Sequence, residues 1–174
     1  DRLYGRLCLR EPTRLLISLE LFVMLVLANG APVVAAGLLK GIWSAPVDGG
    51  RLWKDGRPIL GKSKTWRGVV SGALACGLFS LITGLGFIFG VVFGVFGLIG
   101  DMLSSFIKRR RDLASSARAV GLDQIPEALL PMLLAMWWLP VRGWVVIGVV
   151  VLFTLSNIFA SPLLYRIGIR RHPH

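Results

Sequence analysis

Histidine and cysteine are scarce in this chain of 174 residues, which has two of each. Such low counts exclude a disulfide framework and a zinc site built from spaced cysteine and histidine ligands. Both histidines, His172 and His174, lie in the C-terminal tail, so the loops offer no histidine as a general base. Acidic residues are also few: there are nine, against 20 lysines and arginines. Any chemistry of this chain must therefore use a few carboxylates among many cations.

Apolar residues are abundant instead, at 55% of the chain, and the mean hydropathy is +0.71. They form long blocks between short charged stretches rather than amphipathic stripes, which is the pattern of an integral membrane protein. A net charge of +11 in a soluble domain would suggest nucleic acid. In a membrane protein the same excess is typical of cytoplasmic loops. We therefore expect the membrane, and no nucleic acid, as the partner.

The longest apolar block, 69–100, contains 32 residues without a charge. A single helix of that length would extend about 48 Å, well beyond the roughly 30 Å hydrocarbon core. Two helices need more residues, so we expect a hairpin that continues to about Ile107 and turns near 83–86. This places Asp101 inside the third helix, near its end.

The whole chain, 1–174, is predicted to be one all-α, polytopic membrane domain with about five transmembrane helices. Lysine and arginine number 15 in the segments 40–68, 107–124 and the tail, against five elsewhere. This bias predicts that the N-terminus is outside and that the C-terminus and the two long loops, 40–68 and 108–124, are cytoplasmic. The predicted helices cover 15–39, 69–85, 86–107, 125–139 and 144–165.

Asp101 is the first candidate functional residue, because a carboxylate within a membrane helix is costly and is a functional candidate by default. Helical register places Asp101, Ser105, Lys108 and Asp112 on one face. A carboxylate can hold Mg²⁺, and lysine and arginine can hold phosphate oxygens. The alternative is that Asp101 only pairs with a basic residue and that the cluster 108–111 is an orientation signal.

The glycine-rich loop that precedes the second predicted helix is the other candidate feature. Glycine lets backbone N–H groups approach a phosphate, and the N-terminus of the following helix adds a positive dipole end. The alternative is a solvated basic linker. Residues 56–63 also fit the G-x-x-x-x-G-K-[ST] pattern, but the polar residues before them exclude the buried strand that a P-loop requires. In the first helix, Asn29 beside the Pro32 kink signal is a candidate for a polar pocket.

At these residues the sequence resembles the cytidylyltransferases that form CDP-alcohol lipids, and most closely the archaeal CDP-archaeol synthase family. Residues 100–109, G-D-M-L-S-S-F-I-K-R, match in spacing the G-D-x-x-x-S-x-x-K-R stretch of the related CDP-diacylglycerol synthases. Residues 122–125 are similar to their L-D-R-hydrophobic element, with Gln124 in place of Arg. The archaeal branch adds N-x-x-P, P-x-D-G-G and K-T-W-R-G, which match 29–32, 46–50 and 64–68.

The resemblance implies a multi-pass cell-membrane enzyme whose active site faces the cytoplasm. It would transfer CMP from CTP to an isoprenoid glycerol phosphate lipid, with Mg²⁺ as cofactor, and give CDP-archaeol and pyrophosphate. It implies Asp101 and Asp123 as metal ligands, Lys64 and Lys108 as further catalytic residues and Asn29 as part of the lipid-phosphate pocket. The nucleotide-binding residues would be Asp48, Gly49, Gly50, Lys62, Lys64, Thr65, Arg67, Gly68, Ser105, Lys108, Arg109 and Gln124.

Two other classes of function compete with this interpretation. A small transporter or channel for a phosphorylated or anionic solute would explain intramembrane carboxylates and kinks. A scaffolding protein whose basic loops bind anionic headgroups would explain the charge, but it leaves Asp101, Asp123 and the glycine-rich loop without a role.

Overall fold

The computed structural model describes residues 11–113 and 121–166, which form five α-helices. The prediction of an all-helical chain with five helices is confirmed, and each helix begins and ends within four residues of its predicted range. The helices are α1 (Glu11–Leu39), α2 (Trp66–Thr83), α3 (Phe87–Arg110), α4 (Ile125–Trp138) and α5 (Gly143–Arg166).

The α2–α3 hairpin turns where the length of the apolar block predicts. Helix α2 ends at Thr83, and Gly84 and Gly86 follow with φ of 85° and 95°. Only glycine adopts this left-handed region without strain, so the two glycines set the position of the turn. Because α3 then continues to Arg110, Asp101 lies in its last three turns, as expected.

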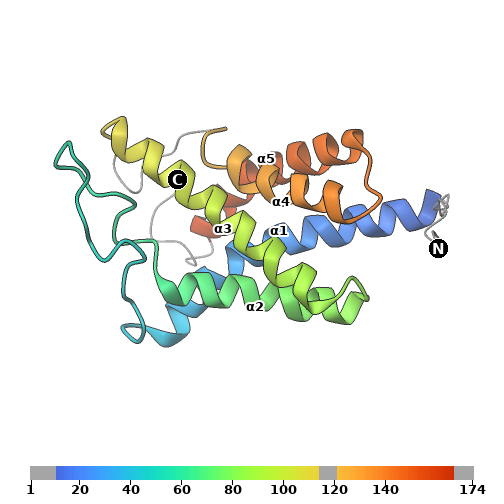
Figure 1. The fold of residues 1–174 in the computed structure, drawn as a ribbon, viewed down its shortest axis with the longest axis horizontal. Helices are drawn as coiled ribbons and strands as arrows, with labels where there is room; N and C mark the ends of the chain where they lie inside the picture. The colour runs from blue at the N-terminus through green and yellow to red at the C-terminus, as the bar shows by residue number, and fades with distance from the viewer. Residues whose placement is uncertain (1–10, 114–120, 167–174) are drawn as a thin grey trace.

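The five helices run alternately in opposite directions (Figure 1). The N-terminal end of α1, the α2–α3 turn and the α4–α5 turn lie at one end of the bundle, and the loop 40–65 and the end of α3 lie at the other. Side chains from α1, α3, α4 and α5 fill the centre. Its largest fully buried residues include Leu21, Met24, Leu25, Phe89, Phe93, Met132 and Phe153.

Small residues let α2 and α3 pack closely. A Cβ atom added at Gly90 would lie 2.4 Å from the Cys76 carbonyl oxygen and 2.4 Å from the Ser80 Cβ. Apolar packing is not driven by water inside a bilayer, so close backbone approach is the main source of attraction between membrane helices. Helices α2 and α3 are therefore in close backbone contact, and this contact positions the C-terminal turns of α3 that contain Asp101.

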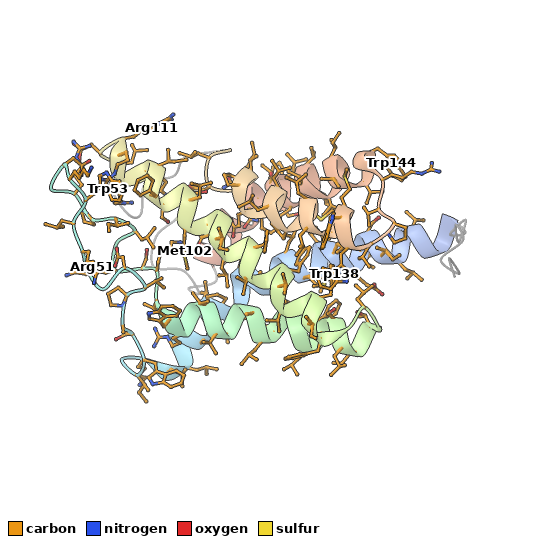
Figure 2. All side chains as sticks on the ribbon, in the orientation of Figure 1. Arg51, Trp53, Met102, Arg111, Trp138 and Trp144 are labelled. Carbon is orange, nitrogen blue, oxygen red and sulfur yellow. The ribbon has the colours of Figure 1, made fainter. Side chains whose placement is uncertain are left out.

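Three of the described helical segments, Leu15–Leu39, Trp66–Thr83 and Phe87–Arg110, are long and apolar enough to cross a membrane. Helix α4 has 14 residues and is about 21 Å long, so it is shorter than a full span. Trp138 and Trp144 are exposed at the C-terminal end of α4 and the start of α5 (Figure 2). Tryptophan at a helix end is typical of the membrane–water interface.

Backbone hydrogen bonds order the loop between α1 and α2, although the described residues form no regular β-strand. Trp53 N donates to Arg57 O and Ile59 N donates to Arg51 O, which makes a small hairpin. A second pairing joins Pro46 and Thr65 in antiparallel fashion. The basic loop therefore has internal backbone pairing, although most of its residues are exposed to solvent.

Candidate active site

The last turns of α3 carry the central part of the candidate site. Ser105 and Lys108 are buried, with 7% and 8% of their surface exposed, and Asp101 is partly buried. Asp101 and Lys108 are seven residues apart, so they lie on one face about 10 Å apart along the helix axis. Asp112 does not continue this face, and that part of the prediction is wrong. The helix ends at Arg110, Asp112 has φ of 59°, and its side chain is 80% exposed.

Two ion pairs join α3 to other segments: one to the loop between α1 and α2, and one to the turn before α4. The Lys64 ammonium contacts the Asp101 carboxylate at 2.5 Å, and the Lys108 ammonium contacts the Asp123 carboxylate at 2.9 Å. All four side chains are between 10% and 29% exposed, so each pair is sheltered but reachable from water. Sequence reasoning selected these four residues, and the structure brings them together as carboxylate–ammonium pairs.

Lys64 is held by the chain on both of its sides. Val47 N donates to the Lys64 carbonyl, and Trp66 N donates to the Ala45 carbonyl. Thr65 is the N-cap of α2, and its Oγ1 accepts from Gly68 N at 3.3 Å. This arrangement fixes the Lys64 backbone directly before the N-terminus of α2, whose Trp66 and Gly68 N–H groups are satisfied by Ala45 and Thr65.

Asp123 is held by a short turn at the start of α4. The Gln124 side chain accepts a hydrogen bond from Gly121 N at 2.9 Å, and Gln124 is 9% exposed. The start of α4 in turn touches α3: a Cβ added at Gly100 would lie 2.2 Å from the Pro126 carbonyl oxygen. This close approach sets the position of Asp123 relative to α3. From the sequence alone, Gly100 was recognised only as the first residue of the motif 100–109.

Arg67 is the predicted nucleotide contact whose observed partners differ most from the expectation. Its guanidinium donates at 2.8 Å to the carbonyls of Lys40 and Ile42, just after α1, and Arg67 is 7% exposed. Gly68 packs against Pro32, with its built Cβ 3.4 Å from the proline Cβ. The two archaeal motifs at 29–32 and 64–68 therefore meet, and in this state Arg67 supports the turn after α1.

Asp48 organises the loop from inside. One of its oxygens accepts from Gly50 N at 2.9 Å, and the other accepts from Leu60 N and Gly61 N at 2.9 and 3.1 Å. Partial burial raises the pKa of this carboxyl, but these backbone donors outweigh the burial and the net pKa is lowered. Gly49 and Gly50 have φ of 61° and 73° and open space where a Cβ would be. Positive φ, rather than close approach of a neighbour, explains the two glycines; their contact with nucleotide stays a prediction.

The remaining predicted residues, Asn29, Lys62 and Arg109, are not members of the two ion pairs. The Asn29 amide donates back to the Leu25 carbonyl at 2.9 Å within α1. Lys62 is exposed on the loop, and the buried Arg109 Nε has no hydrogen-bond partner among the described residues. The assignment of Asn29 to a lipid-phosphate pocket, and of Lys62 and Arg109 to nucleotide, stays a prediction.

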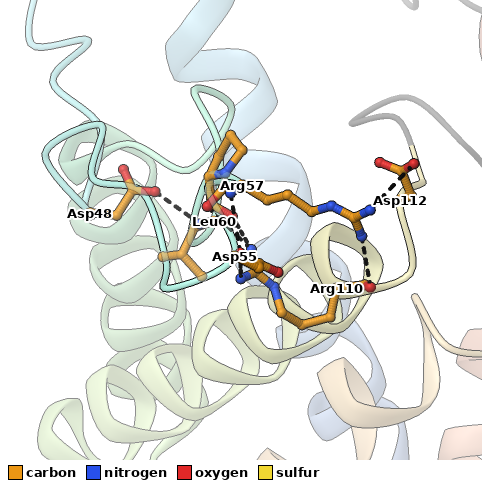
Figure 3. Close-up of polar contacts among 7 residues, drawn as sticks. Asp48, Asp55, Arg57, Leu60, Arg110 and Asp112 are labelled. Carbon is orange, nitrogen blue, oxygen red and sulfur yellow. Dashed lines mark hydrogen bonds and ion pairs between the residues drawn. The ribbon is translucent and has the colours of Figure 1, made fainter.

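A latch between the loop and the end of α3 was missed by the sequence reasoning (Figure 3). We define the latch as Asp55, Arg57, Arg110 and Asp112. Arg57 donates to the Arg110 carbonyl at 3.0 Å and pairs with Asp112 at 3.5 Å. Arg110 pairs with Asp55 at 2.6 Å. The charges of 55–58 were visible in the sequence, but their partners lie more than 50 residues away.

Arg110 makes two further contacts where the loop hairpin 51–59 meets α3. It donates to the Pro58 carbonyl at 2.6 Å and its guanidinium lies 5.1 Å over the Phe106 ring. Trp53 packs edge-on against the same ring, with centroids 5.4 Å apart. The loop that carries Lys64 is thus fixed to the helix that carries Asp101 at a second, distant point.

Changing Arg110→Gln should therefore loosen the hairpin 51–59. We expect the Trp53 and Ile59 amides to exchange with solvent about tenfold faster, because the variant loses an ion pair and two carbonyl contacts. Amide hydrogen exchange measured by mass spectrometry checks this. Arg111→Gln is the matched control, since Arg111 is the adjacent residue and is exposed. Equal exchange in the two variants would contradict the latch.

The site can bind a polyanion together with a cation. It contains two carboxylates and two ammonium groups, which form two ion pairs between largely buried side chains. The N-terminus of helix α2 adds a positive dipole end beside Lys64. Among the described residues no nucleophilic cysteine or histidine stands at the site. Such a set suits positioning and charge stabilisation rather than covalent catalysis.

Comparison with known proteins identifies the relatives of this arrangement. The family model described as CarS-like, CDP-archaeol synthase, matches residues 14–86 and 78–174. The CDP-archaeol synthase of Staphylothermus marinus is 30% identical over 165 residues, which are 87% of this chain and 89% of that protein. The CDP-archaeol synthase of Thermococcus kodakarensis is 40% identical over 111 residues, and this match spans only 56% of the chain and 60% of that relative.

A solved structure has the same fold. It is described as an intramembrane enzyme for the biosynthesis of archaeal membrane lipids. The TM-score is 0.69 at 28% sequence identity, and the match covers 84% of this chain and 93% of that one.

Proposed function

The chain belongs to the CarS-like CDP-archaeol synthase family, and from this premise we propose that it transfers CMP from CTP to an isoprenoid glycerol phosphate lipid in the membrane. The observation that carries the proposal is the pair of carboxylate–lysine contacts at the end of a membrane helix. A lipid phosphate at the bilayer surface can reach such a position without leaving the membrane. Family membership favours this activity over a transporter or a scaffold.

The proposed reaction joins two anions. An oxygen of the lipid phosphate attacks the α-phosphorus of CTP, the bond between that phosphorus and the bridging oxygen breaks, and pyrophosphate leaves. The phosphate monoester has a second pKa near 6 and is largely dianionic at neutral pH, so no protein base has to remove a proton. The protein's task is to hold both anions close and in line.

The residues present fit Mg²⁺ as a cofactor. Magnesium is usually bound by one or two carboxylates together with substrate phosphates and water. Asp101 and Asp123 supply two carboxylates, and no group of three or more potential ligands occurs among the described residues. When bound, the metal would neutralise charge on the triphosphate and polarise it. Asp101 and Asp123 would hold the ion, and Lys64 and Lys108 would bind phosphate oxygens.

The proposed orientation places the active site in the cytoplasm. The loop 40–65 and the end of α3 share one end of the bundle, which supports the grouping of the basic loops on one side (Figure 1). The positive charges of these loops favour the cytoplasmic face. A cysteine introduced at Thr83, the last residue of α2 at the opposite end of the bundle, should react with an impermeant reagent only from outside.

Release of labelled pyrophosphate from CTP tests the activity directly. Purified protein in lipid nanodiscs should release it only when both Mg²⁺ and an archaeal glycerol phosphate lipid are present. Omission of either component is the control for contaminating phosphatase. Release without the lipid, or no release with all components and a folded protein, would contradict the proposal.

A further inference from the structure

The two ion pairs occupy the same groups that the proposed function needs for its ligands. Each carboxylate expected to hold the metal contacts a lysine expected to hold phosphate, at 2.5 Å for Asp101 and 2.9 Å for Asp123. On the basis of the proposed function, we infer that a metal ion and a phosphate ligand must bind together. The metal replaces lysine beside each carboxylate, and the phosphate replaces the carboxylate beside each lysine. In each pair the ammonium supplies the positive charge that a metal ion would supply, and the carboxylate supplies the negative charge that a phosphate would supply.

The exchange makes the metal and the nucleotide depend on each other. A divalent cation alone must displace a lysine, and the released ammonium is then left without a counter-charge in a sheltered place. A triphosphate alone must pull a lysine away from its carboxylate, which leaves two anionic groups facing each other. Only the metal and the triphosphate together provide a partner for every charge. The coupling is reciprocal, as linkage requires.

The burial of the groups supports exchange rather than a permanent structural bridge. The lysines are 19% and 10% exposed, whereas their carboxylates are more exposed, at 29% and 25%. The carboxylate is therefore the more accessible member of each pair. Both lysines also keep anchors that do not depend on the pairs: the Lys64 backbone is paired with Val47, and Lys108 lies within α3. The ammonium groups can turn to a phosphate while the backbone stays in place.

The arrangement also has a consequence for selectivity at a membrane surface. Unpaired lysines at this position would attract the anionic headgroups and free phosphate that surround the protein. Lysines held by carboxylates present little net charge to such anions. The site would then accept an anion strongly only when it arrives with a divalent cation, which distinguishes a metal-bound nucleoside triphosphate from simple phosphates.

Binding measurements without turnover test the inference. The protein in nanodiscs without acceptor lipid is titrated with Mn²⁺ alone, followed by the electron paramagnetic resonance of free Mn²⁺, and with CTP in EDTA, followed by calorimetry. Lys64→Met should bind Mn²⁺ alone about tenfold more tightly than the unchanged protein, because Asp101 is released. Asp101→Asn should bind metal-free CTP about tenfold more tightly, because Lys64 is released. Both variants should bind Mn²⁺ and CTP together more weakly.

The control separates exchange from a general change in charge. Lys54→Met removes an exposed cation from the same loop, at a residue that makes no ion pair among the described residues and is not assigned to the site. It should leave the affinity for Mn²⁺ alone nearly unchanged. An equal gain in Lys54→Met and Lys64→Met, or no gain in Lys64→Met, would overturn the inference.

The second pair gives an independent test if the first variants fold poorly. Lys108→Met and Asp123→Asn should show the same crossed pattern, with tighter binding of the metal in one and of the nucleotide in the other. Failure of the unchanged protein to bind Mn²⁺ and CTP together would count against the proposed function itself. Tight joint binding without any crossed gain in either pair would count against the exchange alone.

Discussion

The Asp101→Asn variant is expected to lose at least about 100-fold in CTP-dependent pyrophosphate release, the size of effect seen when one electrostatic group is removed from an active site. Asn keeps the shape of the side chain but cannot neutralise a divalent cation with a negative charge. It also leaves the Lys64 ammonium without its carboxylate partner. Steady-state rates at saturating Mg²⁺ and lipid provide the measurement, and thermal unfolding in detergent shows whether the variant is folded.

Asp112→Asn is the matched control for this prediction. Asp112 lies just after the same helix, but its side chain is 80% exposed and its ion pair with Arg57 is long, at 3.5 Å. An exposed pair contributes little, so we expect the rate to change less than about threefold. If Asp101→Asn turned over as fast as Asp112→Asn, the role of Asp101 in holding the metal would be refuted.

The helical framework could be predicted because its causes are local and repetitive. An uncharged block too long for one span and too short for two forces the hairpin past Gly100, and this arithmetic placed Asp101 inside α3. Glycines at 84 and 86 marked the turn through their freedom at positive φ. No knowledge of the partners of any side chain was needed for these predictions.

The candidate site was predictable in its members but not in its contacts. Residue type and spacing selected Asp101 and Lys108, and the family resemblance added Lys64 and Asp123. Neither reveals the pairing, which connects loops to α3 across 37 and 15 residues. Periodicity carries no information about such pairs. The same limit explains why the latch was missed.

Two expectations show how one pattern can have different physical causes. Helical register was extended to Asp112, but α3 stops at Arg110 and the chain turns left-handed, so the register does not apply. Gly49 and Gly50 were expected to contact the nucleotide, and the structure gives them a further cause: their backbone follows a turn organised by Asp48. Their contact with nucleotide stays a prediction. A glycine can indicate positive φ or close approach of another group, and the sequence alone does not say whether a turn or a ligand is the cause.

The contact between α3 and α4 should be the most sensitive packing site near the proposed active site. A Cβ at Gly100 would lie 2.2 Å from the Pro126 carbonyl oxygen and 2.7 Å from the Glu127 Cα, and backbone atoms do not move cheaply. We expect Gly100→Ala to lower the free energy of unfolding by about 1–3 kcal/mol or more, as overpacking usually does. The strain should also displace Asp123 from Lys108, because Asp123 lies in the turn 121–124 that leads into α4.

Gly97→Ala tests whether the loss comes from this contact or from any added methyl group on α3. Gly97 is three residues earlier on the same helix, and its nearest neighbours would be at an ordinary 3.6 Å. We expect Gly97→Ala to unfold within a few degrees of the unchanged protein and to keep most of its activity, while Gly100→Ala loses both. Thermal unfolding and pyrophosphate release, measured on both variants in parallel, check the pair. Because the metal and nucleotide groups depend on loops held against α3, a shift of even about 1 Å at Gly100 should cost about 100-fold in rate. Full activity in a folded Gly100→Ala protein would mean that the α3–α4 contact does not position the site.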